Sequence, residues 1–562
     1  MRRLIRNSIF MLMIGLTVAG NTFATTYFIA ANGSDSNNGT SKSTTWQHAP
    51  GMPNCTATCA ATRPQPGDSF IFRGGDTWHF SATTSGANDV PIGGTWDWTW
   101  SGTSTNCNYP TVTTSCIYLG VDKTWFSGAS FARPIMNLDN PIVANTAFPD
   151  ASHPGFVTAC PFPDQTFVAL YLNASDVQAD NFEFLGKCSA VVGTYGKDAE
   201  ILRNGTLISV TNSYFHGWTE VYNPGSGIDQ ETIIAGGGAG AGSGNSTAAT
   251  HNVIAYDVFD GSDSHCTGVN DCTGGPAAYR DAYDVHNCIF RWMSNGLNSP
   301  SNVTTVHDNL FEFMYESYDT ANHGGVVEMG QTYTGAIVTF YNNVVRHTNI
   351  GITLDLFDPG NLYYFNNVSY DIGNGGNGFQ LENLAPATPV TAYISNNTWD
   401  PYTIRYLDQD PTQIWNGTTY FENNHFIGYS PAAVTSLYSC NTGATCTETD
   451  NGSEVWQSES VANGQGYTPS NNYAPTSGTG ATVGAGSNLT AFCTGIPDTN
   501  AAAACKMGIG GVTYDSVNHV AVPVTPATRP ASGAWNAGAY QFNVSGSTNP
   551  PNPPTLLVSI PQ

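Results

Sequence analysis

The sequence predicts an all-β protein built as a parallel β-solenoid of roughly ten coils with loop insertions. Charged residues make up only 10% of the 562 residues, whereas there are 60 glycines and 32 prolines and 12% of the residues are aromatic. This balance suits many short strands joined by turns better than it suits helices. A strand–corner–strand pattern also recurs along the chain, with corners that are often Asn-Asn. An apolar residue precedes every corner at a fixed distance, as expected when stacked coils share one core.

The repeat starts near residue 206 and runs through eight copies. In each copy an apolar residue lies three positions before the second corner residue, and a mostly aromatic or apolar residue lies two positions after it. Because strand side chains alternate between faces, a two-residue corner can leave both positions pointing inward. Asn tolerates left-handed backbone angles, and its amide can bond to the Asn one coil above. The second corner residues are Ser213, Asp257, Cys288, Asn309, Asn343, Asn367, Asn397 and Asn424.

The N-terminus has the composition of a secretory signal peptide. Three arginines within the first six residues precede an apolar stretch (9–19), and a small-x-Ala cleavage site ends at Ala24. We expect residues 1–24 to be removed and the mature protein to be secreted, to the medium, the periplasm or the cell surface. The apolar run is too short to span a bilayer, so no membrane insertion is expected after cleavage.

The thirteen cysteines are spaced as close neighbours, which suits disulfides formed in an oxidising compartment. Cys288 is the odd one, and it occupies a corner position between the inward residues Val285 and Phe290. We therefore expect it to be a reduced, inert core thiol, the alternative being a bond to Cys266 or Cys272. The expected disulfides are Cys55–Cys59, Cys107–Cys116, Cys160–Cys188, Cys266–Cys272, Cys440–Cys446 and Cys493–Cys505.

Both ends of the array resemble a known family. TTYFIAANGSDSNNGT (25–40) and PQPGDSFIFRGGDTW (64–78) are similar to the N-terminal coil of many secreted β-helix proteins, and RPASGAWNAGAYQF (529–542) resembles the closing coil of bacterial members. With the Asn-Asn coils, they resemble the right-handed parallel β-helix of the pectin-lyase-like superfamily. The resemblance implies one right-handed parallel β-helix domain over 25–543, and the Pro-rich segment 544–562 is expected to be a linker or tail.

Three carboxylates stand at matching positions in successive coils. Glu328, Asp355 and Glu382 each follow a glycine by four residues. If the coils are in register, these residues stack on one face about 4.8 Å apart, and their mutual repulsion separates their pKa values. Paired carboxyls can catalyse glycoside hydrolysis, and stacked ones can bind Ca²⁺. On an exposed face they can also be merely solvated.

A second candidate cluster lies on the strands before the corners. Asp284, His286 and His307 occupy outward positions on neighbouring coils, where a His pair beside a carboxylate can act as an acid–base group or a metal site. Aromatic residues continue along the same face. If exposed, they form a platform that stacks on sugar rings, although outward aromatics usually lie under a loop. They are Tyr341, Tyr363, Phe365, Tyr393 and Tyr420.

Charge and fold together restrict the function. A formal net charge of -25 opposes binding to nucleic acid and to anionic membrane surfaces. The superfamily that the sequence resembles includes glycosidases, lyases and adhesins. We expect a monomeric, secreted enzyme that cleaves a polysaccharide in a groove on the β-helix, by hydrolysis with paired carboxylates, because carboxylates far outnumber cationic bases. The alternatives are a calcium-dependent polysaccharide lyase using the same face and a non-catalytic surface, adhesion or carbohydrate-binding protein.

Overall fold

A computed structural model provides the structure of the protein. The residues it describes are 24–81, 88–103, 115–140, 142, 157–160, 168–189, 199–221, 233–236, 251–264, 266, 276–279, 284–298, 303–315, 326–329, 337–348, 352–356, 360–372, 379–383, 390–400, 417–428, 446–450 and 452–542. The expected signal peptide (1–24), apart from Ala24, and the whole tail (544–562) lie outside them. Among the described residues, no helix is long and apolar enough to cross a membrane.

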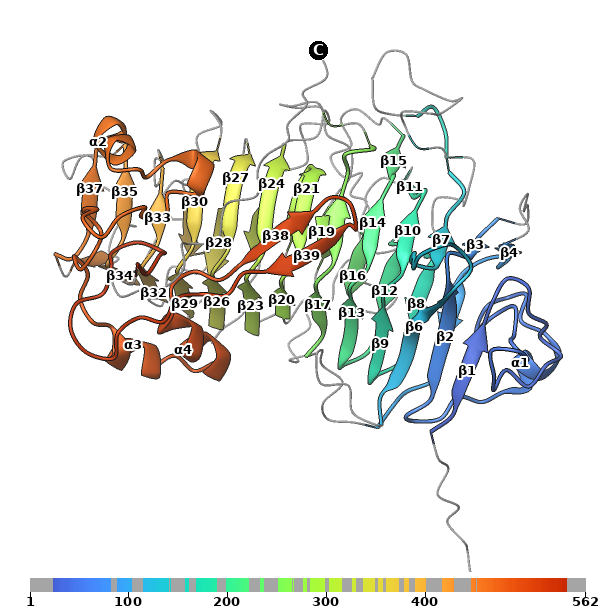
Figure 1. The fold of residues 1–562 in the computed structure, drawn as a ribbon. Coiled ribbons are helices and arrows are strands. Elements are labelled where there is room, and N and C mark those ends of the chain that lie inside the picture. Colours follow the sequence, from blue (N-terminus) through green and yellow to red (C-terminus); the bar gives the residue numbers. More distant parts are fainter. Residues whose placement is uncertain are drawn as a thin grey trace, which may run out of the picture.

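Three long parallel sheets run along the molecule (Figure 1), and in the described residues they have 13, 13 and 9 strands. The predicted fold class, a parallel β-helix, is confirmed. Sheet A orders β1 (Thr26–Ile29), β2 (Ser69–Gly74), β6 (Ile117–Phe126), β9 (Val177–Asp180), β13 (Ile208–Thr211), β17 (Val253–Ala255), β20 (Asp284–His286), β23 (Val303–His307), β26 (Ile337–Tyr341), β29 (Asn361–Phe365), β32 (Val390–Ser395), β34 (Gly417–Glu422) and β36 (Cys446–Asp450).

The other two long sheets follow the same stacking order. Sheet B orders β4 (Asp89–Pro91), β3 (Thr77–His79), β7 (Ile135–Asn137), β10 (Glu183–Leu185), β14 (Tyr214–His216), β18 (Val258–Asp260), β21 (Ile289–Met293), β24 (Leu310–Met314), β27 (Val344–Thr348), β30 (Val368–Ile372), β33 (Thr398–Trp399), β35 (His425–Ile427) and β37 (Val455–Gln457). Sheet C orders β5 (Trp96–Trp98), β8 (Leu170–Leu172), β12 (Ile201–Arg203), β16 (Ile234–Gly236), β19 (Pro276–Tyr279), β22 (Asn295–Asn298), β25 (Val327–Met329), β28 (Ile352–Leu356) and β31 (Phe379–Asn383).

Short elements complete the described structure. The pair β11 (Cys188–Ser189) and β15 (Thr219–Glu220) is parallel, and β38 (Val512–Asp515) and β39 (Val520–Pro523) form an antiparallel hairpin. The helices are α1 (Ala57–Ala61), α2 (Glu459–Gly464), α3 (Thr490–Thr494) and α4 (Thr499–Cys505), with a 3₁₀ turn over Pro469–Asn471.

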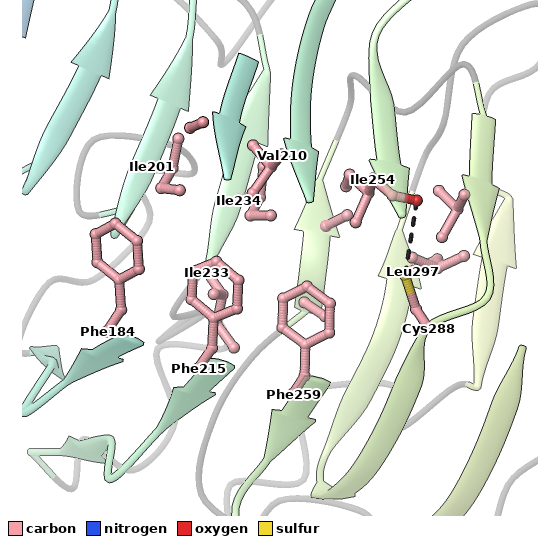
Figure 2. Packing of buried hydrophobic residues seen from close by; sticks show 14 of the residues in the cluster. Phe184, Ile201, Val210, Phe215, Ile233, Ile234, Ile254, Phe259, Cys288 and Leu297 are labelled. Carbon is pink, nitrogen blue, oxygen red and sulfur yellow. Dashed lines mark hydrogen bonds between the residues drawn. The ribbon is translucent and has the colours of Figure 1, made fainter. Parts of the chain in front are cut away.

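The core is built from columns of like side chains, one per coil. Phe184, Phe215, Phe259, Phe290 and Phe311 are fully buried, and neighbouring rings stack with centroids 4.7–5.2 Å apart. Figure 2 shows the first three of these rings in a row, facing isoleucines and valines from the other two sheets. The predicted inward positions on either side of each corner are therefore confirmed, and the core is one continuous apolar column.

The corner between sheets A and B is held by asparagine. The first residue of the Asn-Asn pair takes the left-handed conformation, as at Asn342 (φ 56°) and Asn366 (φ 56°). The second is buried, and its side chain donates to the next one: Asn343 Nδ2 lies 3.1 Å from Asn367 Oδ1. The same bond continues from Asn309 to Asn424 at 3.0–3.1 Å. The predicted amide ladder is confirmed, and it satisfies buried polar groups that would otherwise be costly.

Asp257 occupies this column with a carboxyl group in place of an amide. Its Oδ1 accepts from the Ser213 N–H at 2.6 Å, while Oδ2 has no partner among the described residues. Burial raises its pKa well above the ordinary range. By contrast, Asn309 Nδ2 donates to the Val285 carbonyl of the preceding coil at 3.0 Å. The Asp257 carboxyl group can donate a hydrogen bond as that amide does only when it is protonated.

We expect Asp257→Asn to stabilise the protein by about 1–3 kcal/mol, because an amide can donate where the carboxylate cannot. The folded parent holds a proton that the unfolded chain releases, so its stability falls as pH rises from about 4 toward the raised pKa. Urea unfolding at pH 5 and pH 8 should show a larger gain at pH 8. A variant less stable than the parent at both pH values would contradict this account.

Cys288 is free and fully buried, and its thiol lies 3.6 Å from the Ile254 carbonyl oxygen (Figure 2). Burial raises the pKa of this thiol well above its ordinary value. The rival bond to Cys266 is wrong, since Cys266 is disulfide-bonded while Cys288 is free. We expect one thiol to react with a maleimide only after denaturation. Rapid labelling of the native protein would contradict this expectation.

Three of the six expected disulfides are confirmed, namely Cys55–Cys59, Cys160–Cys188 and Cys493–Cys505. Cys116 is also disulfide-bonded, as Cys266 is. The expected partners of these two, and the bond between Cys440 and Cys446, lie outside the described part of the chain.

The C-terminal segment (452–542) folds back over the outer faces of sheets A and B (Figure 1). The hairpin β38–β39 packs Val512 and Ala521 on an apolar outward column of sheet B. Arg133 anchors its turn by donating to the carbonyls of Asn518 and His519 at 3.2 and 3.0 Å. Helices α3 and α4 lie against sheet A, so the C-terminal segment decides which outward side chains of these two sheets meet solvent.

Candidate functional site

The predicted carboxylate column lies on the neighbouring strands β25, β28 and β31 of sheet C. Asp355 pairs with Glu382, as expected, but Glu328 pairs with Thr353. The expectation that all three are in register is therefore wrong. The coil from Glu328 to its partner is 25 residues long and the next coil is 27, so equal sequence spacing does not give equal register. The side chains of these three acids lie outside the described part.

The second predicted cluster does come together, on strands β20 and β23 of sheet A. The rings of His286 and His307 stack with centroids 4.9 Å apart. His307 Nε2 lies 3.3 Å from Asp284 Oδ1, and its Nδ1 lies 2.7 Å from Asp308 Oδ2. Asp308, which the sequence did not single out, also accepts from the Gly511 N–H at 2.8 Å.

These contacts make His307 the cation of an ion-pair network. Burial lowers its pKa, but hydrogen bonds to Asp284 and Asp308 outweigh burial and raise the pKa to about 10. Desolvation lowers the pKa of His286, so that ring is neutral near pH 7. Both nitrogens of His307 face carboxylates, which makes the cluster a clamp between coils rather than a free acid–base pair.

The described residues give no support for a metal centre. Among them, no group of three or more His, Cys, Asp or Glu side chains is placed to hold an ion. The His286–His307 pair therefore does not fit a metal site. The acids proposed as calcium ligands, Glu328, Asp355 and Glu382, have side chains outside the described part of the chain.

The aromatic platform predicted on sheet A is largely covered. Tyr341, Tyr363 and Phe365 are buried against α3 and α4, with Leu489 and Trp535 in the same cluster. Their assignment as exposed sugar-binding residues is wrong, because a segment more than a hundred residues further along the chain packs on them. The two remaining candidates, Tyr393 and Tyr420, are partly buried and stack on each other at 5.0 Å.

A charged column runs along the outer face of sheet B, three residues after each corner. Arg291 lies 3.7 Å from Asp260 and 3.4 Å from Glu312. Arg346 donates two hydrogen bonds to Glu312 Oε2, at 2.7 and 3.0 Å. Charges thus alternate from coil to coil, and each guanidinium bridges neighbouring strands. The column continues through Tyr370 and Asp400.

Near the end of this column are two carboxyl groups, Asp371 after Tyr370 on one coil and Asp400 on the next, and the charge of Asp371 acts on Asp400. The Asp400 N–H donates to the Ser369 carbonyl at 2.9 Å, which keeps Asp400 in the ladder. Asp371 takes a left-handed conformation (φ 49°), its side chain is 69% exposed, and Oδ2 lies 2.6 Å from His347 Nδ1. Asp400 is only 4% exposed, and its Oδ1 has no partner among the described residues.

The two carboxyl groups differ in environment, which separates their chemistry. Burial, then the charges of Glu459 and Asp371, raise the pKa of Asp400 to about 7. Asp400 therefore holds a proton up to neutral pH, whereas the exposed Asp371 is bound to an imidazole. A protonated carboxyl group beside an accessible carboxylate is the arrangement that general acid catalysis requires.

Sequence reasoning missed this pair, although a signal was present. Residues three positions after the corner include Arg291, Glu312, Arg346, Tyr370 and Asp400, an unusually charged set in a chain with few charges. The predicted sites lay at the outward positions before the corner and on the strands after the glycines. The charged residues of this outward column would have pointed to the part of sheet B where Asp371 and Asp400 lie.

Comparisons with known proteins find structural likeness at low identity and no matching family. A scan against protein-family models finds no match, and neither does a search of curated proteins. Similar solved structures include a rhamnogalacturonan lyase (13% identity, 76% of this chain and 88% of that one, TM-score 0.36) and pectate lyase Pel9A (14%, 93% and 98%, 0.36). A third is the GH136 lacto-N-biosidase from Eubacterium ramulus (12%, 77% and 68%, 0.38). The chain is a parallel β-helix. Its three sheets establish this by themselves, and likeness at this level carries no statement about the reaction.

Proposed function

We propose that the protein is an extracellular glycoside hydrolase that cleaves a polysaccharide lying on the outer face of the β-helix at Asp371 and Asp400. The observation that supports this most is the pairing of an exposed carboxyl group with a buried, protonated one on adjoining coils. The resemblance of both ends of the chain to secreted β-helix proteins, and the three disulfides, favour export.

The roles follow from the environments. Asp400 donates its proton to the glycosidic oxygen as the bond to the anomeric carbon breaks. Asp371, held by His347, attacks that carbon or takes a proton from the attacking water. Asp371 and Asp400 stand on neighbouring coils, about 4.8 Å apart, at positions one residue apart along the strand, which favours the short separation of carboxyl groups in retaining enzymes, roughly 5 Å. We therefore propose retention, with Asp371 as nucleophile and Asp400 returning as the base that activates water.

A panel of neutral and acidic polysaccharides, with and without chelator, tests the proposal. We expect new reducing ends from a neutral polysaccharide, no ultraviolet-absorbing unsaturated ends, and no loss of activity with chelator. Unsaturated ends that require calcium would instead support a lyase. If no substrate is cleaved, the non-catalytic alternative, a surface or carbohydrate-binding protein, takes first place.

The pair Asp355–Glu382 on sheet C is a second candidate site for the same reaction, because its backbone register is the one that paired carboxyls need. Variants separate the two sites on any substrate that the parent cleaves. Asp371→Asn and Asp400→Asn should abolish cleavage while Asp355→Asn leaves it intact. The reverse result would move the active site to sheet C.

A further inference from the structure

Three aromatic residues occupy one corner position in successive coils, just after the charged column of sheet B. Trp292, Phe313 and His347 all have left-handed backbones, with φ of 53°, 55° and 52°. Their rings stack, with centroids 4.4 Å apart for the first pair and 5.2 Å for the second, and interplanar angles of 9° and 12°. All three side chains are partly exposed. They form an aromatic strip on the surface.

The conformation is unfavourable for these residue types. A left-handed backbone costs a residue with a Cβ about 1–2 kcal/mol, and bulky side chains are genuine outliers there. Other coils solve the same corner with glycine: Gly217 (φ 66°) and Gly428 (φ 74°) stand at the equivalent position. Folding alone therefore does not require aromatic side chains at this corner. Three consecutive coils nonetheless carry them.

The strip leads directly to the proposed reaction centre. The next residue in the same corner position is Asp371, which is bound to His347 at 2.6 Å. At the other end, the residue before Trp292 in this column is Gly261. Arg291 lies 5.8 Å from the centroid of the Phe313 ring, a cation–π contact beside the strip.

We propose that Trp292, Phe313 and His347 form the binding strip for the substrate, a neutral polysaccharide chain that runs along the corner and delivers a glycosidic bond to Asp371 and Asp400. The inference rests on the proposed function. Because the three rings stack face to face, the strip meets a sugar with its ring edges, which offer apolar contact and, at Trp292 and His347, ring nitrogens. A neutral chain fits because the net charge of -25 repels a polyanion, and Asp371 at the end of the strip adds to that repulsion.

Glycine substitutions give a test that a merely structural role would not pass. Phe313→Gly and Trp292→Gly remove the ring but relieve the left-handed backbone. We expect binding of the neutral polysaccharide cleaved by the parent to weaken about 3- to 10-fold for each ring. The thermal midpoint should stay unchanged or rise. Trp125→Ala, at another partly exposed aromatic residue, is the matched control and should bind like the parent.

Binding is measured by affinity electrophoresis in an Asp400→Asn background, so that cleavage does not consume the ligand. Strip variants that bind as tightly as their background would overturn the inference while leaving the proposed hydrolase intact. Variants that lose binding only in proportion to a lower thermal midpoint would also overturn it, because the rings would then be structural. A parent protein that neither binds nor cleaves any neutral polysaccharide would overturn both proposals.

Discussion

Asp400→Asn is expected to lower kcat at least 100-fold on the polysaccharide that the parent cleaves, because a positioned general acid contributes about 10²–10⁴-fold. The same substitution should stabilise the fold. The raised pKa of about 7 means that the folded protein holds a proton that the unfolded chain releases above about pH 4, so Asp400 lowers stability as pH rises from 4 to 7. The amide removes this penalty, which is at most about 4 kcal/mol at pH 8.

Activity assays and urea unfolding at pH 5 and pH 8 check both halves of this prediction. Asp122→Asn serves as a comparison, because this carboxylate on strand β6 has its pKa lowered to about 2, chiefly by a hydrogen bond from Lys42. That change should not stabilise the protein at pH 8 and should leave cleavage unaltered. An Asp400→Asn variant that is fully active, or that is destabilised more at pH 8 than at pH 5, would refute the role given to Asp400.

Arg346→Met should destabilise the protein by about 3–5 kcal/mol, the range for removing one partner of a buried ion pair. The substitution removes both hydrogen bonds to Glu312 and leaves that buried carboxylate, within the described part of the chain, facing only Arg291 at 3.4 Å. It also removes the contact of the guanidinium with Asn472, which ties the C-terminal segment to sheet B at 3.1 Å. Urea unfolding of the parent and the variant measures the loss.

The double variant Arg346→Met/Glu312→Met is the control for this prediction. With the carboxylate gone as well, two apolar side chains of similar length replace the pair, and most of the lost stability should return. A double variant no more stable than Arg346→Met alone would show that the loss comes from the missing hydrogen bond to Asn472 rather than from an uncompensated charge.

The repeat itself could be predicted because its rules are local. The spacing of an apolar residue, an Asn-Asn corner and a second apolar residue repeats within each coil, and the structure places Val306, Asn343 and Phe290 where that spacing demands. The burial of Cys288 could be predicted from the same column of corner residues. The length of each coil is not set by a local pattern. The coil that starts at Glu328 is 25 residues long rather than 27, so Glu328 pairs with Thr353 and not with Asp355.

The exposed surface could not be predicted in the same way. Whether Tyr341 and Phe365 face solvent depends on α3 and α4, which lie more than a hundred residues downstream and carry no repeat. The pKa of Asp400 likewise depends on Glu459, 59 residues away at the start of α2. The chemistry of a site in this fold therefore depends on which segments fold back over a sheet. The repeat pattern of a single sequence does not show which segments do so.

The most direct test of the account is the pH dependence of kcat/KM for the parent and for Glu459→Gln. Glu459 is an exposed residue in the first turn of α2, and its charge helps to raise the pKa of Asp400. If Asp400 is the general acid, activity should fall above about pH 7 in the parent, and the alkaline limb should move to lower pH in Glu459→Gln. An alkaline limb that stays at the same pH after this substitution would contradict the claim that Asp400 delivers the proton.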